Sequence, residues 1–283
     1  MASHGASAQI YAPTTVEDWL YCPMYRHLRR TWLPERVEWD PARLLGTSVG
    51  TGLSTHWRHV RAGTAVDTPE YWATILEAAV APLRAEWQEC DLTLGGAEKL
   101  VSRGLAEALA AGLDVGAGVL RVDESIGVSR PDLIVRKAQS LGGGLEVWDV
   151  KTARSLDARY VQERLSGYDT LWQLYHGAWE AEQYYGEKVI RCGILQVILS
   201  PKAQALLHPV EMDVTHLGQW LQTAEQVWQD MSAEERGSRP VTQRYTSCEK
   251  RRYGRARCEF HAACHTCFLD EEKMARLYDR RVQ

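Results

Sequence analysis

One predicted strand organises this chain of 283 residues: residues 147–152 read VWDVKT. Successive side chains of a strand point to opposite faces, so Asp149 and Lys151 project from the same face. The preceding apolar strand carries Asp132, and the glycine-rich residues 140–144 predict the hairpin loop that joins the two strands. We therefore expect the hairpin to bring Asp132 beside Asp149 and Lys151.

The segments around this hairpin predict an α/β fold. Apolar residues at a spacing of two predict further strands near residues 119–123, 189–199 and 205–212. Apolar residues at helical spacing predict helices near residues 14–30, 43–61, 69–89, 97–112, 160–185 and 213–232. The first of these helices opens on a capping box, Thr14 to Glu17, and is interrupted at Tyr21-Cys22-Pro23, because proline cannot continue the preceding turn.

The order of these elements indicates one α/β unit. We expect a single domain over residues 1–283, with a helical part at 14–115, an α/β core at 116–212, and a helix with a Cys-rich tail at 213–283. The tail is poor in apolar residues, so something other than a hydrophobic core must order it.

Composition and charge exclude several classes of protein. Apolar residues make up 45% of the chain and charged residues 25%, as in ordinary globular proteins. The net charge of −4 excludes a uniformly basic coat for nucleic acid, although local patches remain open. Apolar runs such as residues 193–199 are far shorter than the ~20 residues of a membrane helix. Residues 1–9 lack the basic and apolar regions of a secretory signal, which predicts a cytoplasmic protein with no membrane contact.

The carboxylates and the lysine are the parts of a phosphodiesterase site. Two carboxylates that converge in a partly buried place repel each other, and a divalent cation relieves that repulsion while binding phosphate oxygens. A nearby lysine can orient water and stabilise charge that builds on phosphorus. The alternative is structural: Asp132 caps a turn, and Asp149 with Lys151 forms an ordinary ion pair.

The surroundings of these residues resemble the PD-(D/E)XK nuclease superfamily. An aspartate after proline, a Gly-rich hairpin, a strand ending in Asp-Val-Lys-Thr and a helix carrying Trp172-Gln173-Leu174-Tyr175 follow in the order of that family. The likeness is greatest to RecB-type nuclease domains, the CRISPR-associated adaptation exonuclease and phage-borne relatives. It implies a restriction-endonuclease-like core, in which helices flank a mixed central sheet.

The resemblance also implies the role of each residue. Asp132, Asp149 and the Val150 carbonyl are expected to bind Mg²⁺ or Mn²⁺, and Lys151 to act as the catalytic lysine. Gln173 is expected to support the lysine or contact DNA. Glu124 matches an acidic position often seen in the family, although a solvated glutamate at a strand edge is an equal alternative.

Two positions depart from the family pattern. Relatives often have a tyrosine four residues after the glutamine, and position 177 is glycine here. Relatives also commonly carry a metal-binding histidine in Gly-Thr-x-x-His, whereas Gly46-Thr47-Ser48-Val49 leads to Gly50. His56 and His59 lie too far around the helix from position 50 to replace it.

The cysteines predict a second metal site. The chain has seven, an odd number, and an intracellular protein of this size does not need disulfides. Cys248, Cys258 and Cys264 follow the spacing C-x9-C-x5-C, and this tail, together with Cys22-Pro23, resembles the iron–sulfur members of the family. The resemblance implies a structural [4Fe-4S] cluster on Cys22, Cys248, Cys258 and Cys264 that clasps the two ends of the chain.

Other arrangements of the cysteines stay open. Zinc accepts four thiolates or a mixed set drawn from His261, His265 and Cys267, and Cys267 could replace Cys264. Unligated thiols are the remaining alternative. Cys90 and Cys192 are expected to be buried as small apolar residues.

Arginines near these cysteines predict a DNA-facing surface. Arg26 and Arg30 follow Cys22, and Arg251, Arg252 and Arg255 lie between two tail cysteines. If one cluster holds both segments, these cations share a face that can follow phosphates. Solvated surface charge is the alternative.

Together these patterns predict a metal-dependent deoxyribonuclease, and the resemblance implies an exonuclease acting on single-stranded DNA or DNA ends. A homo-oligomer, or a helicase, CRISPR or recombination protein as partner, is compatible with the resemblance. Because Gly50 replaces the histidine, a non-catalytic DNA-binding or scaffolding module with the same fold is the alternative. A protein with a zinc-binding tail and some other hydrolytic activity is a third possibility.

Overall fold

The computed structural model describes residues 10–32, 40–64, 66, 68–88, 90–111, 113, 118–153, 168–211, 214–241, 258, 260 and 271–277. The chain divides into two compact units, one formed by residues up to 38 and from 219 onward, the other by residues 39–218. The single domain over residues 1–283 stays a prediction. In the part that is described, no helix is both long and apolar enough to cross a membrane.

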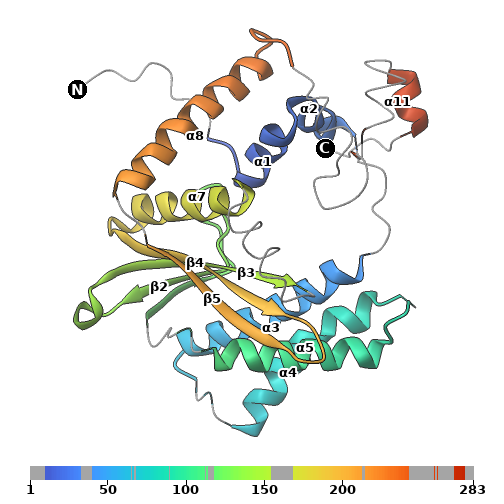
Figure 1. Ribbon diagram of the computed structural model, residues 1–283, viewed down its shortest axis with the longest axis vertical. Helices are drawn as coiled ribbons and strands as arrows, with labels where there is room; N and C mark the ends of the chain where they lie inside the picture. The colour runs from blue at the N-terminus through green and yellow to red at the C-terminus, as the bar shows by residue number, and fades with distance from the viewer. Residues whose placement is uncertain are drawn as a thin grey trace. The chain divides into compact units, whose positions relative to one another are not determined.

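A five-stranded sheet forms the centre of the unit of residues 39–218 (Figure 1). Its order is β1-β2-β3-β4-β5, and its strands are β1 (Val119–Val122), β2 (Leu133–Lys137), β3 (Gly144–Ala153), β4 (Val189–Ile198) and β5 (Gln204–Glu211). The first three strands form an antiparallel meander, β3 and β4 are parallel, and β5 is antiparallel to β4. The predicted mixed sheet is therefore confirmed.

The hairpin between β2 and β3 depends on glycine. The chain turns through a short 3-10 helix, Gln139–Leu141, and continues at Gly142, Gly143 and Gly144 with φ values of 97°, 62° and 102°. Side chains with a Cβ rarely adopt such angles. The turn sets the register that pairs Leu133 with Trp148.

Helices cover both faces of this sheet, as predicted. On one face, α3 (Pro41–Arg61), α4 (Pro69–Glu86) and α5 (Leu94–Ala110) pack in one apolar core with strand residues such as Leu133 and Trp148. On the other face lies α7 (Tyr168–Tyr185) (Figure 1). It packs through Leu174 and Ala178 on Ile134 and Val147. Because a parallel pair of strands needs a crossover connection, α7 lies between β3 and β4 in the chain.

One close contact brings α3 to the end of β3. A Cβ on Gly46 would lie 2.8 Å from the Thr152 hydroxyl, so glycine allows this approach. The helix therefore passes beside the end of the strand that carries Lys151.

The other unit contains α1 (Pro13–Tyr21), α2 (Pro23–Thr31), most of α8 (Val214–Glu235) and α11 (Glu271–Leu277). The predicted junction at Cys22 is confirmed, because α2 begins at Pro23 directly after it. The predicted capping box is wrong. Proline occupies the first position of α1, Ala12 is the N-cap, and no side chain caps the helix. Thr14 therefore lies within the first turn, and Glu17 is buried.

A buried carboxylate on α7 holds the turn that precedes Asp132. Glu180 is 6% exposed, and its carboxylate accepts hydrogen bonds from the backbone N–H groups of Val128 and Ser129, at 2.8 Å each, and from the Ser129 hydroxyl. His176 lies one turn earlier on α7, with Nε2 3.5 Å from Glu180. The turn closes tightly on the carboxylate: Gly127 has φ +57°, and a Cβ there would collide with Glu180.

Burial by itself would raise the pKa of Glu180. Hydrogen bonds from His176, Ser129 and Val128 outweigh that effect and hold the pKa below its ordinary value of 4.5. The ionised carboxylate is therefore a net stabilising group in the folded chain.

We expect Glu180→Gln to lower the free energy of unfolding by about 1–3 kcal/mol at pH 7, because the amide turns donors toward the buried N–H groups. A lowered pKa means that the stabilisation is fully present above the ordinary glutamate pKa of 4.5 and is lost as the pH falls through the lowered value. The difference between wild type and variant should therefore shrink on acidification, as measured by urea unfolding over a pH series.

The exposed Glu77 on α4, paired with Arg84, provides the control, and Glu77→Gln should cost less than about 0.5 kcal/mol. An equal loss for Glu180→Gln at every pH would contradict a role for the charge.

Candidate active site

Two aspartates meet at neighbouring strands of the sheet. Leu133 pairs with Trp148 across β2 and β3, so Asp132 and Asp149 occupy the next positions along the two strands. The Val150 backbone N–H donates to Asp132 Oδ2 at 2.6 Å, which ties the start of β2 to β3. The hairpin thus brings Asp132 to β3, as the sequence predicts.

The lysine and the glutamine complete the group. Lys151 Nζ lies 2.5 Å from Asp149 Oδ2 and donates to Gln173 Oε1 at 3.2 Å. Lys151 comes from β3 and Gln173 from α7, so packing of the helix on the sheet sets this contact. The structure brings Asp132, Asp149, Lys151 and Gln173 together, and their catalytic roles stay predictions.

The carboxylate pair is electrostatically strained. Burial, and then repulsion by Asp149, raise the pKa of Asp132 well above its ordinary value of 3.8, although the Val150 N–H and the Lys151 ammonium oppose the rise. A divalent cation between the two carboxylates would remove the repulsion, and hard oxygen donors suit Mg²⁺ and Mn²⁺. The residues present therefore fit such an ion.

These two carboxylates would be a partial ligand set. Across the described ranges, no group of three or more His, Cys, Asp or Glu side chains is placed to hold a metal. Magnesium usually keeps several waters and takes substrate phosphate oxygens as ligands. The Val150 carbonyl, water and substrate would have to supply the remaining oxygens.

The structure shows what surrounds Gly50 and Gly177, the two positions that depart from the family pattern. A Cβ on Gly50 would meet no atom within 4 Å, whereas His56 hydrogen-bonds the Tyr71 hydroxyl and the His59 ring lies 5.5 Å from the Tyr71 ring. Both histidines are thus engaged with α4. Gly177 is buried, and a Cβ there would lie 3.5 Å from Val147, so α7 runs close to β3 at that position.

Two of the four predicted cluster ligands lie in one apolar core. Cys22 and Cys258 are 4% and 6% exposed, and both belong to a buried cluster with Tyr25, Phe260 and Met274. Segments from opposite ends of the chain therefore share this core. Cys248, Cys264 and Cys267 lie outside the described residues, and the iron–sulfur cluster stays a prediction.

Of the two cysteines predicted to be buried outside the cluster, one is buried and one is exposed. Cys192 is buried, as predicted. The prediction for Cys90 is wrong: it is exposed, with Sγ 3.2 Å from the Leu92 carbonyl oxygen, in the turn before α5.

The predicted DNA-facing arginines of α2 contact α8. Arg26 is buried and its guanidinium forms an ion pair with Glu235, while the exposed Arg30 lies 3.0 Å from the same carboxylate. Arg251, Arg252 and Arg255 lie outside the described residues. A DNA contact from any of the five stays a prediction.

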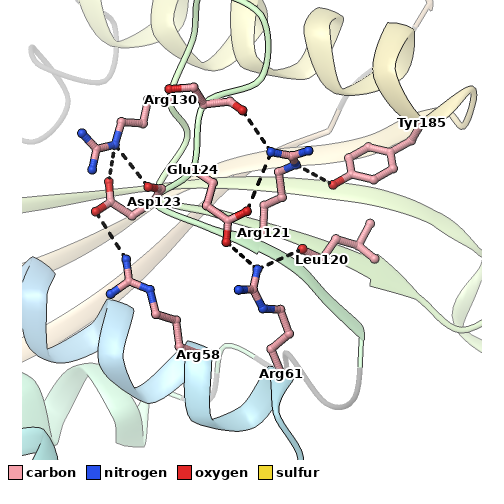
Figure 2. Close-up of polar contacts among 9 residues, drawn as sticks. Arg58, Arg61, Leu120, Arg121, Asp123, Glu124, Arg130 and Tyr185 are labelled. Atoms are coloured by element: carbon pink, nitrogen blue, oxygen red, sulfur yellow. Dashed lines mark hydrogen bonds and ion pairs between the residues drawn. The ribbon is translucent and has the colours of Figure 1, made fainter.

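The sequence interpretation named Glu124 but missed Glu180. Glu180, seven residues after Gln173, lies on the same face of α7, and the sequence holds no signal for its contact with the turn at Val128 and Ser129. Glu124, expected near an acidic position of the family, forms ion pairs with Arg61 at 2.6 Å and Arg121 at 3.7 Å (Figure 2).

The chain is similar to a nuclease family and to a solved structure. A protein from Eubacterium rectale, to which exonuclease activity is ascribed, is similar in structure, with 14% sequence identity, a TM-score of 0.48, and coverage of 86% of this chain and 89% of that chain. No curated protein matches the sequence. The family model for the PD-(D/E)XK nuclease superfamily matches residues 11–265, a span that contains Asp132, Asp149, Lys151 and Gln173. The chain therefore belongs to the PD-(D/E)XK nuclease superfamily.

Proposed function

We propose that this chain is a metal-dependent deoxyribonuclease that cleaves phosphodiester bonds at Asp132, Asp149 and Lys151. The observation that carries the proposal is the carboxylate pair at neighbouring strands, with Lys151 held between Asp149 and Gln173. Membership of the superfamily implies a nucleic-acid substrate.

Asp132, Asp149 and the Val150 carbonyl would hold Mg²⁺ or Mn²⁺. When bound, the cation acts as a Lewis acid on the phosphodiester and lowers the pKa of a bound water. The hydrogen bond from Val150 N–H orients the Asp132 carboxylate toward β3.

Lys151 supplies the fixed positive charge of the site. Asp149 and Gln173 restrain its ammonium group, so little rotamer freedom remains to be lost when substrate binds. The ammonium group can then orient the attacking water and stabilise negative charge that builds on the phosphoryl oxygens.

Exonuclease action on single strands or DNA ends follows from the resemblance to RecB-type and CRISPR-associated nucleases. Gly50 supports a second candidate, a non-catalytic DNA-binding module, because open space stands where relatives carry a histidine ligand.

We also propose a structural [4Fe-4S] cluster on Cys22, Cys248, Cys258 and Cys264. Its support is the shared apolar core that holds Cys22 and Cys258 from the two ends of the chain. Thiolates in a buried, apolar setting are the ligands of such clusters, and the spacing of the tail cysteines resembles the iron–sulfur branch of the family.

We expect Lys151→Ala and Asp149→Asn to fold normally and to reduce cleavage of end-labelled DNA in Mn²⁺ by at least about 100-fold, because each removes a charge from the reacting centre. The control is Lys202→Ala, an exposed lysine between β4 and β5, which should cleave like wild type. Retained cleavage by Asp149→Asn would refute the assignment. Tight DNA binding by a wild type that never cleaves would favour the non-catalytic module.

We expect protein purified without oxygen to absorb near ~400 nm and Cys22→Ala to lose that absorbance and most of its iron, because a ligand is missing. Cys192→Ala, a buried cysteine outside the predicted ligand set, is the matched control and should keep its iron. Cys264→Ala and Cys267→Ala identify which thiol binds. A colourless wild type with stoichiometric zinc would replace the cluster by a zinc site.

A further inference from the structure

Four arginines gather next to the candidate active site around two carboxylates. We call Arg58, Arg61, Arg121 and Arg130 the arginine cluster; they surround Asp123 and Glu124 (Figure 2). Arg58 and Arg61 come from α3, and the other four residues come from β1 and the segment that leads to β2.

Each carboxylate is shared by two arginines. Asp123 lies 2.8 Å from Arg130 Nε and 3.7 Å from Arg58. Glu124 lies 2.6 Å from Arg61 and 3.7 Å from Arg121. Four guanidinium groups face two carboxylates, so two positive charges are in excess.

Further contacts restrain the guanidinium groups. Arg121 donates from Nε to the Tyr185 hydroxyl at 3.1 Å and lies over the Tyr184 ring at 4.5 Å. Arg61 donates to the Leu120 carbonyl at 3.4 Å (Figure 2). Yet Arg130 and Arg58 are 61% and 47% exposed, so their free N–H edges are open to a ligand in solution.

Asp123, which the arginine cluster surrounds, lies in line with Asp132 and Asp149 across the sheet. Val122 pairs with Leu133 and Leu133 pairs with Trp148, so Asp123, Asp132 and Asp149 occupy the next positions on three neighbouring strands. Neighbouring strands are about 4.8 Å apart, which puts the Asp123 backbone about 10 Å from that of Asp149. That distance is about three nucleotides of a stacked strand, which carries one phosphate per 3.4 Å or so.

The backbone at Asp123 is held in a costly conformation. Its φ is +52°, a left-handed value that residues other than glycine adopt at a cost. Its N–H donates to the Asp132 carbonyl at 2.9 Å, and its own carbonyl accepts from Arg130 Nε at 3.2 Å. Such conformations persist where the surrounding structure over-determines them, and they concentrate at functional sites.

We propose that the arginine cluster binds the phosphates of a nucleic-acid strand whose scissile phosphodiester lies at Asp132 and Asp149. This inference rests on the proposed function and extends it to how the substrate strand is held. Guanidinium groups pair with phosphate oxygens in bidentate geometry, and here Asp123 and Glu124 orient them before the strand arrives. The excess of two positive charges matches two internal phosphates or one terminal phosphate.

The test uses Lys151→Ala, which we expect to bind without cutting, and a labelled 20-nucleotide single strand with either a 5′-phosphate or a 5′-hydroxyl. Fluorescence anisotropy gives Kd between 50 and 200 mM KCl. Adding Arg58→Gln and Arg130→Gln should raise Kd at least about 10-fold at 100 mM KCl and reduce the salt slope of log Kd by about 1.4, at about 0.7 for each lost phosphate contact. A loss confined to the 5′-phosphate strand identifies a terminal phosphate; an equal loss for both identifies internal phosphates.

Two further variants distinguish an effect of charge on binding from an effect of misfolding. Arg84→Gln removes an exposed arginine of α4 that also pairs with two glutamates, and should leave Kd unchanged. Asp123→Asn keeps a residue that tolerates the left-handed conformation while removing a negative charge, and should tighten binding several-fold. A gain of affinity is not a result that loss of folding produces.

Unchanged Kd and salt slope in the Arg58→Gln, Arg130→Gln protein would overturn the inference. Cleavage by the parent chain with Lys151 intact, measured in parallel, keeps the two proposals apart. A parent that cleaves, with binding independent of the arginine cluster, refutes the inference alone. A parent that never cleaves, with binding that depends on the arginine cluster, refutes the nuclease proposal alone.

Discussion

The hydrogen bond between the Val150 N–H and the Asp132 carboxylate is the constraint on which the candidate site depends. It holds a carboxylate whose ionised form is costly next to Asp149, at the point where the hairpin brings two strands together. Nearby features keep the two strands in this register: the glycines of the hairpin, the turn held by Glu180, and the helix α7 that lies over both. The local repulsion is offset by the packing of the whole unit, which is how a fold keeps a strained site.

The helix α7 contacts both the strand that carries Lys151 and the turn that precedes Asp132. Gln173, Gly177 and Glu180 lie on one face of α7, at a spacing of four and three residues. The first contacts the lysine of β3, the second lies beside Val147 of β3, and the third holds the turn before β2. A shift of α7 would therefore disturb the lysine and the aspartate together.

Much of this arrangement was predictable from local sequence. Alternation along VWDVKT and the glycines at 142–144 predict the hairpin, and the hairpin alone brings Asp132 to Asp149. Glu180 and the arginine cluster were not predictable, because each depends on which distant segments meet and neither has a local period. The capping box at Thr14 failed for a local reason: Pro13 has the backbone angle of a first helical residue, so the N-cap is Ala12, two positions before Thr14.

The two outer strands of the sheet have features that oppose pairing with another chain. Among the strands described, β1 and β5 are outermost; β1 has four residues and carries Arg121, and β5 has Pro209 opposite Gly193. A proline offers no N–H to a further strand, and a short, charged strand offers few pairing sites. Extension of the sheet from copy to copy, a common route to aggregation, is thus disfavoured at both edges.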